Sequence, residues 1–315
     1  MHEKPGRYEK IFDVVALGEA MVEFNQTQAG HPHYLQGFGG DTSNAVIAAS
    51  RAGVKTAYLS RVGQDTFGQA LMGLWAEENV DASAVECDKS ASTGLYFVTH
   101  GAGGHEFSYL RADSAASRMT PSWLRQSAAR TIRDARILHV SGISLAISLS
   151  ACDTAFAAMR LARDSGTLVS FDSNLRLKLW PLDRALACTS HAISMCDIFL
   201  PSLDDITALV GMTNPEQVVD WGHQLGARQV VLKLGSQGAL VSDGRTQESI
   251  PGHHVNLLDA TGAGDCFCGN LLARISLGDN IFEATRYANA AAALAVQGYG
   301  AVAPLPRPEQ VMALL

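Results

Sequence analysis

Residues 258–270 could perform chemistry, because a turn of small residues leads directly into an apolar, helix-like segment. At the start of such a helix, the amides of Gly262, Ala263 and Gly264 can point together at one anion, which the helix dipole also attracts. Asp265 follows these amides, at a position where its carboxylate stays ionised and can accept a proton from an alcohol. The run therefore predicts a site where a phosphate group meets a hydroxyl group.

Other interpretations of this run compete with the phosphate site. A glycine pair before an acidic residue is also typical of a helix that needs only a turn and an acidic N-cap. A dinucleotide-binding fingerprint fits poorly, because Phe267 stands where its third glycine belongs. The Gly-Lys-Ser/Thr ending of a Walker P-loop is absent as well. The wider run favours the phosphate site.

A second glycine run, residues 37–53, joins a flexible approach to an alanine-rich segment that ends in Gly53, as a helix often does. Gly39 and Gly40 let the backbone come close to a ligand, while Asn44 offers both a donor and an acceptor to sugar hydroxyls. The same pattern is also typical of a plain loop followed by a capped helix.

The segments that must position these two runs alternate between strand-like and helix-like patterns. The strand-like segments are 12–18, 55–62, 136–140, 167–171, 196–200 and 229–234; the helix-like segments are 42–51, 67–78, 150–165, one after Ser202 and two within 264–297. This alternation predicts a parallel sheet with helices on both faces.

Residues 92–111 break the alternation, because two strand-like segments flank a Gly-Ala-Gly-Gly turn. That pattern is typical of a β-hairpin. We expect a β lid over the site, formed from about residues 20–38 and 92–112. The sequence has no repeat, low-complexity tract or long linker, so we predict a single domain over residues 1–315.

The composition excludes some classes of protein. With 47% hydrophobic and 17% charged residues among 315, burial can offset the entropy lost on folding. The net charge of −7 argues against nucleic acid or an anionic membrane as a partner, because neutralising phosphates takes clustered Lys and Arg. The clearest basic cluster, Arg125, Arg130, Arg133 and Arg136, is expected on one solvated helix face.

The six cysteines form neither C-x-x-C pairs nor His-containing metal patterns, so we expect reduced core thiols, Cys266 and Cys268 included. The first ten residues are polar, and no later segment approaches the length of a membrane span. A cytoplasmic protein is expected.

In this order, with residues 61–68 between them, the two glycine runs closely resemble the two motifs of the ribokinase or PfkB family of carbohydrate kinases. The resemblance covers nearly the whole chain. Within the family, residues 18–24, 138–146 and 172–180 are most similar to kinases of 2-keto-3-deoxygluconate. The resemblance implies an α/β, ribokinase-like fold, in which helices flank a central, mostly parallel sheet and a small β-sheet lid covers the active site.

The resemblance also implies a role for each site residue. Asp265 would be the catalytic base, and Gly262, Ala263 and Gly264 would form the anion hole. The residues that would bind ATP are Ser202, Lys233, Gly235, Gly238, Gly262, Gly264 and Asn289. The residues that would hold the sugar are Gly39, Gly40, Asn44, Tyr96, Tyr109, Arg111, Arg176 and Asp265.

Two departures from the family pattern concern the metal and the sugar. Many relatives carry Asn-x-x-Glu where this chain has Ser202 and Asp205, so Mg²⁺ would be held by Asp205 through water. Leu175, between Asn174 and Arg176, stands where the family pattern would have an aromatic residue. The exposed edges of an open β lid suggest a homodimer formed through the lids, and a monovalent cation is a further candidate cofactor.

The activity that follows is ATP- and Mg²⁺-dependent phosphorylation of 2-keto-3-deoxygluconate at O6. Arg111 and Arg176 carry that choice, because two guanidinium groups match a carboxylate better than a neutral sugar. Fructokinase, ribokinase and 5-dehydro-2-deoxygluconokinase activities share the phosphate machinery and stay open as alternatives. A non-catalytic sugar or nucleotide sensor and a dinucleotide-dependent oxidoreductase are more distant alternatives.

Overall fold

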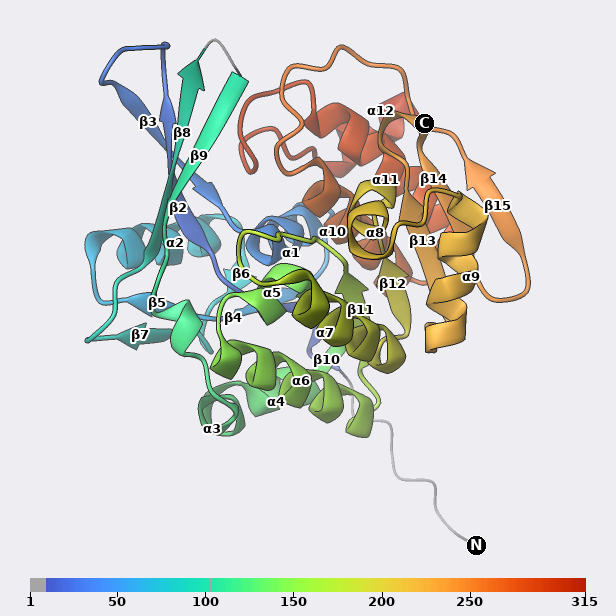
Figure 1. Cartoon of the computed structure of the whole chain (residues 1–315), viewed down its shortest axis with the longest axis horizontal. Helices are drawn as coiled ribbons and strands as arrows, with labels where there is room; N and C mark the ends of the chain where they lie inside the picture. Colours follow the sequence, from blue (N-terminus) through green and yellow to red (C-terminus); the bar gives the residue numbers. More distant parts are fainter. Residues whose placement is uncertain (1–9, 102–103) are drawn as a thin grey trace, which may run out of the picture.

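The structure, a computed structural model, describes residues 10–101 and 104–315. A nine-stranded sheet forms its centre (Figure 1). In spatial order its strands are β15 (Gln247–Ile250), β14 (Ala239–Ser242), β13 (Gln229–Lys233), β12 (Ile198–Leu200), β11 (Leu168–Asp172), β10 (Ala135–Ser141), β1 (Phe12–Leu17), β4 (Thr56–Leu59) and β6 (Val80–Asp81). The strands from β13 to β6 are parallel, and β14 and β15 add an antiparallel edge.

Helices cover both faces of this sheet. On one face lie α1 (Asp41–Arg51), α10 (Ala263–Leu277) and α11 (Ile281–Ala295); on the other lie α4 (Ala129–Arg133), α6 (Leu149–Asp164), α7 (Leu182–Met195), α8 (Leu203–Val210) and α9 (Pro215–Leu225). The remaining helices are α2 (Thr66–Glu77), α3 (Pro121–Trp123), α5 (Gly142–Ala146) and α12 (Pro308–Leu314).

The strand β1 shows why the sheet is covered on both sides. Its residues alternate between the faces, so Val15 and Leu17 pack in one hydrophobic core while Val14 and Ala16 pack under the opposite helices. All four are at most 1% exposed, which is typical of a parallel strand buried on both faces. The predicted α/β architecture, a mostly parallel sheet with helices on both faces, is confirmed.

A second sheet of four strands stands at one end of the central sheet (Figure 1). In order its strands are β3 (Tyr34–Gly39), β2 (Met21–Gln26), β8 (Gly94–Gly101) and β9 (Gly104–Leu110). The pair β2–β8 is parallel, and the hairpins β2–β3 and β8–β9 are antiparallel. We call these four strands the lid sheet; the homodimer expected through it stays a prediction.

Two local predictions were wrong in detail. The segment 55–62 is not one strand, because β5 (Arg61–Gly63) leaves the central sheet and pairs with β7 (Glu86–Asp88). Ser60 lies at the break, and its hydroxyl donates to the carbonyl of Gly18 at 2.7 Å. Arg136 lies in β10 rather than on a helix with Arg130 and Arg133, because the helix ends at Arg133.

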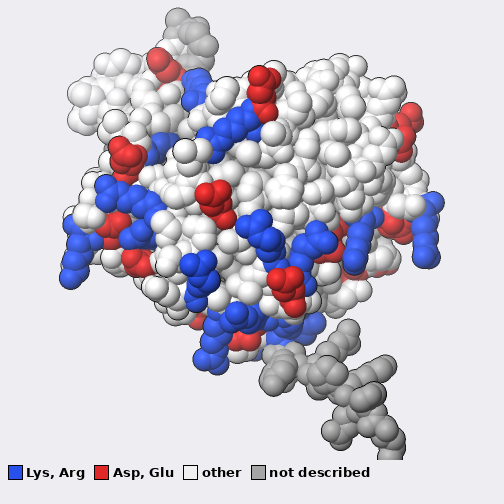
Figure 2. Space-filling view, turned by 60° about the horizontal axis from the view of Figure 1, so that its bottom comes forward, with Lys and Arg blue, Asp and Glu red and all other residues white. Residues whose placement is uncertain are grey.

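Lys and Arg side chains gather on the face that Figure 1 shows at the bottom, where Figure 2 views the molecule. Among the exposed arginines of the protein, Arg130 contacts Asp134, and Arg136 contacts Asp13. Such exposed pairs are typical of a solvated surface, and the absence of a nucleic-acid partner stays a prediction. In the described part of the chain, no helix combines the length and the apolar character needed to span a membrane.

Candidate active site

A cavity of about 860 Å³ opens between the lid sheet and the carboxyl ends of the central strands. Asp172 at the end of β11 and Lys233 at the end of β13 lie in its wall, which is where open α/β sheets usually bind ligands. The expected site residues that line it are Gly39, Gly40, Asn44, Tyr96, Tyr109, Arg111, Arg176, Ser202, Asp205, Lys233, Gly235, Gly262, Gly264 and Asp265.

Two helix starts bring the glycine runs together. Asp265 lies in the first turn of α10, and Nδ2 of Asn44 in α1 donates to its Oδ2 at 2.8 Å. The helices approach closely because Gly269 has no side chain: a Cβ there would lie 2.1 Å from the carbonyl oxygen of Ala45. Oδ1 of Asn44 is buried and has no hydrogen-bond partner within the described residues, so it can accept from a ligand hydroxyl.

The carboxyl group of Asp265 lines the cavity, and its pKa is raised to about 7, mainly by desolvation. The carboxylates of Asp41 and Asp172 contribute to this rise, whereas the hydrogen bond from Asn44 and the ammonium of Lys233 oppose it. A proton acceptor works best when its pKa lies near the working pH. The carboxylate is therefore suited to take a proton from a bound hydroxyl group.

We expect kcat to fall as the pH drops below about 7, because protonated Asp265 cannot accept the hydroxyl proton. The measurement is kcat against pH with saturating substrates. Asn44→Ala removes a hydrogen bond that lowers the pKa, so its inflection should move to higher pH. A wild-type kcat that stays constant down to the ordinary range of an aspartate, near 3.8, would contradict this assignment.

The turn before α10 depends on Gly262. Its φ of +74° lies in the left-handed region, and a Cβ there would lie 3.0 Å from Cα of Ala301. Gly264 has no positive φ, and a Cβ there would meet only Nζ of Lys233, at 3.7 Å. Space in front of Gly264 therefore opens toward the cavity, as an anion site requires. The amide of Ala263 already donates to Ala260 within the turn, at 3.2 Å.

Lys233 and Asp172 form a buried ion pair on the cavity floor. Nζ of Lys233 donates to both carboxylate oxygens of Asp172 at 2.8 Å, and Sγ of Cys268 lies 3.6 Å from Nζ. Burial alone would lower the pKa of Lys233, but the carboxylate of Asp172 raises it well above its usual value. The ammonium therefore stays charged beside the turn that precedes Asp265.

The lid sheet lines one side of the cavity with aromatic side chains. The rings of Tyr96, Phe107 and Tyr109 stack with centroids 5.7–6.4 Å apart. The hydroxyl of Tyr96 donates to Glu23 at 2.5 Å, so it is already engaged within the protein. Gly39 permits this arrangement, since a Cβ there would lie 2.3 Å from that hydroxyl oxygen.

The two arginines expected to bind a carboxylate differ in their surroundings. Nε of Arg111 donates to Glu19 at 2.8 Å, and Nη2 bonds the same carboxylate oxygen, so a neighbouring charge compensates this guanidinium. Arg176 is exposed, and its Nη1 donates to the carbonyl of Leu175 at 2.8 Å. Lys178 is also exposed and lines the cavity beside Arg176.

The expected magnesium ligand, Asp205, lies in the first turn of α8 and lines the cavity. Its Oδ2 accepts from the hydroxyl of Ser173 at 2.8 Å, and its amide donates to Ser202. The described residues contain no group of three or more His, Cys, Asp or Glu that could enclose a metal ion. Because Mg²⁺ in proteins is often held by one or two carboxylates, waters and substrate phosphates, the role of Asp205 stays a prediction.

Three of the expected residues do not line the cavity. Asn289 uses Nδ2 to donate to the carbonyls of Ile250 and Pro251, which ties α11 to the end of β15. Gly238 has a φ of +95°, and a Cβ there would lie 2.1 Å from the carbonyl oxygen of Ile250. Ala263 begins α10. The structure gives these residues local packing roles, and their contact with a nucleotide stays a prediction.

The sequence interpretation missed several polar residues of the cavity wall, among them Glu19, Asp41, Asp172 and Lys178. Asp41 accepts from Nδ2 of Asn174 at 2.7 Å. Two of them had a signal in the sequence. Glu19 closely follows β1 and Asp172 ends β11, and ligands usually bind where the carboxyl ends of such strands meet.

Comparisons with known proteins agree with this geometry. The sequence pattern of the family described as pfkB family carbohydrate kinase matches residues 12–308. A fructokinase from Solanum tuberosum is 32% identical over 316 residues, which cover 96% of this chain and 95% of that protein. A putative ribokinase II from E. coli, solved with ATP and Mg²⁺, has a TM-score of 0.88 at 26% identity, covering 96% and 99% of the two chains. A fructokinase from Vibrio cholerae O395, solved with fructose, ADP and calcium, has a TM-score of 0.84 at 29% identity, covering 96% and 98%.

Proposed function

The chain belongs to the pfkB family of carbohydrate kinases, which are ATP-dependent phosphotransferases, and from this premise we propose that it phosphorylates a six-carbon keto sugar, fructose first. The observation that carries the proposal is the carboxylate of Asp265 at the cavity floor, held by Asn44 beside the turn at Gly262. Relatives named fructokinase support the choice of acceptor. The compensated charge of Arg111 supports a neutral sugar.

In this proposal the protein's own groups position the acceptor and accept its proton. Asn44 and Gly40 face the sugar, and Asp265 takes the proton from the hydroxyl that attacks phosphorus. The α10 N-terminus and the ammonium of Lys233 stabilise the charge that develops on the phosphoryl group. Mg²⁺, held near Asp205 through water, would neutralise charge on the nucleotide phosphates.

A second candidate is phosphorylation of 2-keto-3-deoxygluconate at O6. The observation that favours it is the pair of exposed cations, Arg176 and Lys178, on one side of the cavity. A planar guanidinium matches a carboxylate, and a charge-assisted hydrogen bond is about twice as strong as a neutral one. Arg111 supports this candidate less than the sequence suggested, because Glu19 already occupies its guanidinium.

The test is a coupled ADP-release assay with fructose, ribose and 2-keto-3-deoxygluconate. We expect fructose to have the highest kcat/KM. Replacing both Arg176 and Lys178 with Gln should leave fructose almost unchanged and should weaken the sugar acid, by about 1.5–3 kcal/mol for each charged hydrogen bond lost. A wild type that prefers the sugar acid would establish the second candidate, and no turnover with any sugar would reject both.

A further inference from the structure

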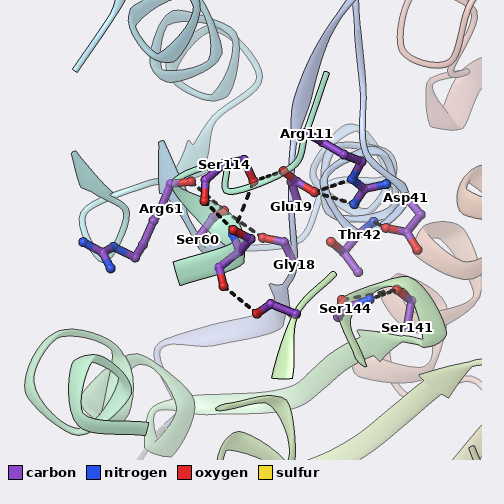
Figure 3. A network of polar contacts seen from close by, with 12 residues as sticks. Gly18, Glu19, Asp41, Thr42, Ser60, Arg61, Arg111, Ser114, Ser141 and Ser144 are labelled. Atoms are coloured by element: carbon purple, nitrogen blue, oxygen red, sulfur yellow. Dashed lines mark hydrogen bonds and ion pairs between the residues drawn. The ribbon is translucent and has the colours of Figure 1, made fainter. Parts of the chain in front are cut away.

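Glu19 lies where the chain crosses between the central sheet and the lid sheet. The outgoing segment leaves β1 after Leu17 and enters the lid at Met21, and the returning segment leaves β9 and passes through Arg111 and Ser114. Figure 3 shows the carboxylate of Glu19, on the outgoing crossing, between Arg111 and Ser114 of the returning crossing. It is only 1% exposed, which is rare for a carboxylate unless its charge is paired.

Both carboxylate oxygens of Glu19 bond the returning segment. Oε2 accepts from Nε of Arg111 at 2.8 Å and from its Nη2, while Oε1 accepts from the hydroxyl of Ser114 at 2.5 Å (Figure 3). Backbone encloses the residue on other sides. A Cβ on Gly94 would lie 2.7 Å from Oε1, and a Cβ on Gly40 would lie 2.5 Å from the carbonyl oxygen of Glu19. The carboxylate is therefore fixed in place.

This arrangement decides what Arg111 can offer a ligand. The side chain of Arg111 is 10% exposed, and both it and Glu19 line the cavity. An anionic ligand that approached the guanidinium would have to compete with Glu19 and would lie near a second negative charge in a poorly hydrated site. A neutral hydroxyl can accept a hydrogen bond from the same guanidinium without that repulsion.

We propose that Glu19 sets the charge preference of the sugar pocket, neutralising Arg111 so that neutral sugars are selected over sugar acids. The inference rests on the proposed function, because it assumes that the acceptor lies beside Arg111. It assigns Glu19 a positioning and specificity role rather than a catalytic one. The lone cation would otherwise attract carboxylates through charge-assisted hydrogen bonds.

The decisive variant is Glu19→Gln, because it keeps the shape of the side chain and removes only its charge. The amide oxygen can still accept from Arg111, and the amide nitrogen can donate to the oxygen of Ser114. We expect the ratio of kcat/KM for 2-keto-3-deoxygluconate to that for fructose to rise by about tenfold, as for one charged hydrogen bond gained. An unchanged ratio would overturn the proposal.

Two controls separate charge from structure. Ser114→Ala removes one hydrogen bond and keeps the charge of Glu19, so both substrates should change by the same factor. The double variant Glu19→Met with Arg111→Met has no net charge at this pair, as in the wild type. Its ratio of kcat/KM for the two substrates should therefore stay at the wild-type value, which tests the proposal even if Glu19→Gln folds poorly. A strong loss confined to the acid in the double variant would show that Arg111 binds the carboxylate directly, and would overturn the proposal.

A binding measurement distinguishes failure of this inference from failure of the proposed function. Calorimetry with D-gluconate and sorbitol, without ATP, needs no turnover. Tighter binding of gluconate, and unchanged binding of sorbitol, is expected in Glu19→Gln relative to wild type. If no sugar is phosphorylated, the proposed function fails, whereas the gluconate-to-sorbitol ratio still decides the role of Glu19. Equal gluconate affinity in the two proteins would reject that role.

Discussion

The variant Asp265→Asn is expected to lose roughly 10²–10⁴-fold in kcat, because it removes the positioned group that accepts the hydroxyl proton. The amide oxygen of the substituted side chain is isosteric with the carboxylate oxygen and can still accept from Nδ2 of Asn44. The fold and the affinity for ATP should therefore be retained. The measurements are kcat in the ADP-release assay and the nucleotide Kd by calorimetry.

The stability of the same variant gives an independent check. Desolvation raises the folded-state pKa of Asp265 from 3.8 to about 7, so its favourable contribution is fully present below 3.8 and is lost as the pH rises through about 7. Asparagine has no such dependence. Relative to wild type, Asp265→Asn should therefore gain thermal stability as the pH rises from 5 to 8. A variant that keeps more than about a tenth of wild-type kcat would exclude Asp265 as the base.

The local structure around the glycine runs could be predicted from the sequence, because it depends on neighbouring residues. The turn at Gly262, the start of α10 and the helix after Gly40 each follow from residue types with strong conformational preferences. The alternation of strand-like and helix-like segments likewise predicted the parallel sheet, because a parallel strand buried on both faces consists of a continuous run of apolar residues.

The pairing of charges across the cavity could not be predicted, because it depends on which strands are neighbours. Lys233 and Asp172 are 61 residues apart, and Glu19 and Arg111 are 92 apart. Their contacts follow from the strand order and from the path of the lid crossings, which local patterns do not specify. Arg111 shows the consequence: its residue type suggested a carboxylate ligand, whereas the fold supplies the carboxylate of Glu19.

The ion pair on the cavity floor is expected to serve both stability and turnover, and variants of its two residues can separate these roles. Lys233→Met leaves the carboxylate of Asp172, 5% exposed, without its cation. Losing one partner of a buried pair typically destabilises a protein by about 3–5 kcal/mol. The same change removes the ammonium beside Gly264. In the wild type this ammonium lowers the pKa of Asp265. Unfolding in urea measures the first effect, and kcat measures the second.

The double variant Lys233→Met with Asp172→Leu distinguishes the two roles, because it removes both charges together. An apolar pair of similar volume is often as stable as the buried ion pair that it replaces. Most of the lost stability should therefore return, while kcat should stay at least about tenfold below wild type, because one charged hydrogen bond to the phosphoryl group is still missing. The inflection of its pH profile should stay close to that of wild type, since Asp172 and Lys233 shift the pKa of Asp265 in opposite directions. Full recovery of kcat along with stability would mean that Lys233 acts only through packing and takes no part in phosphoryl transfer.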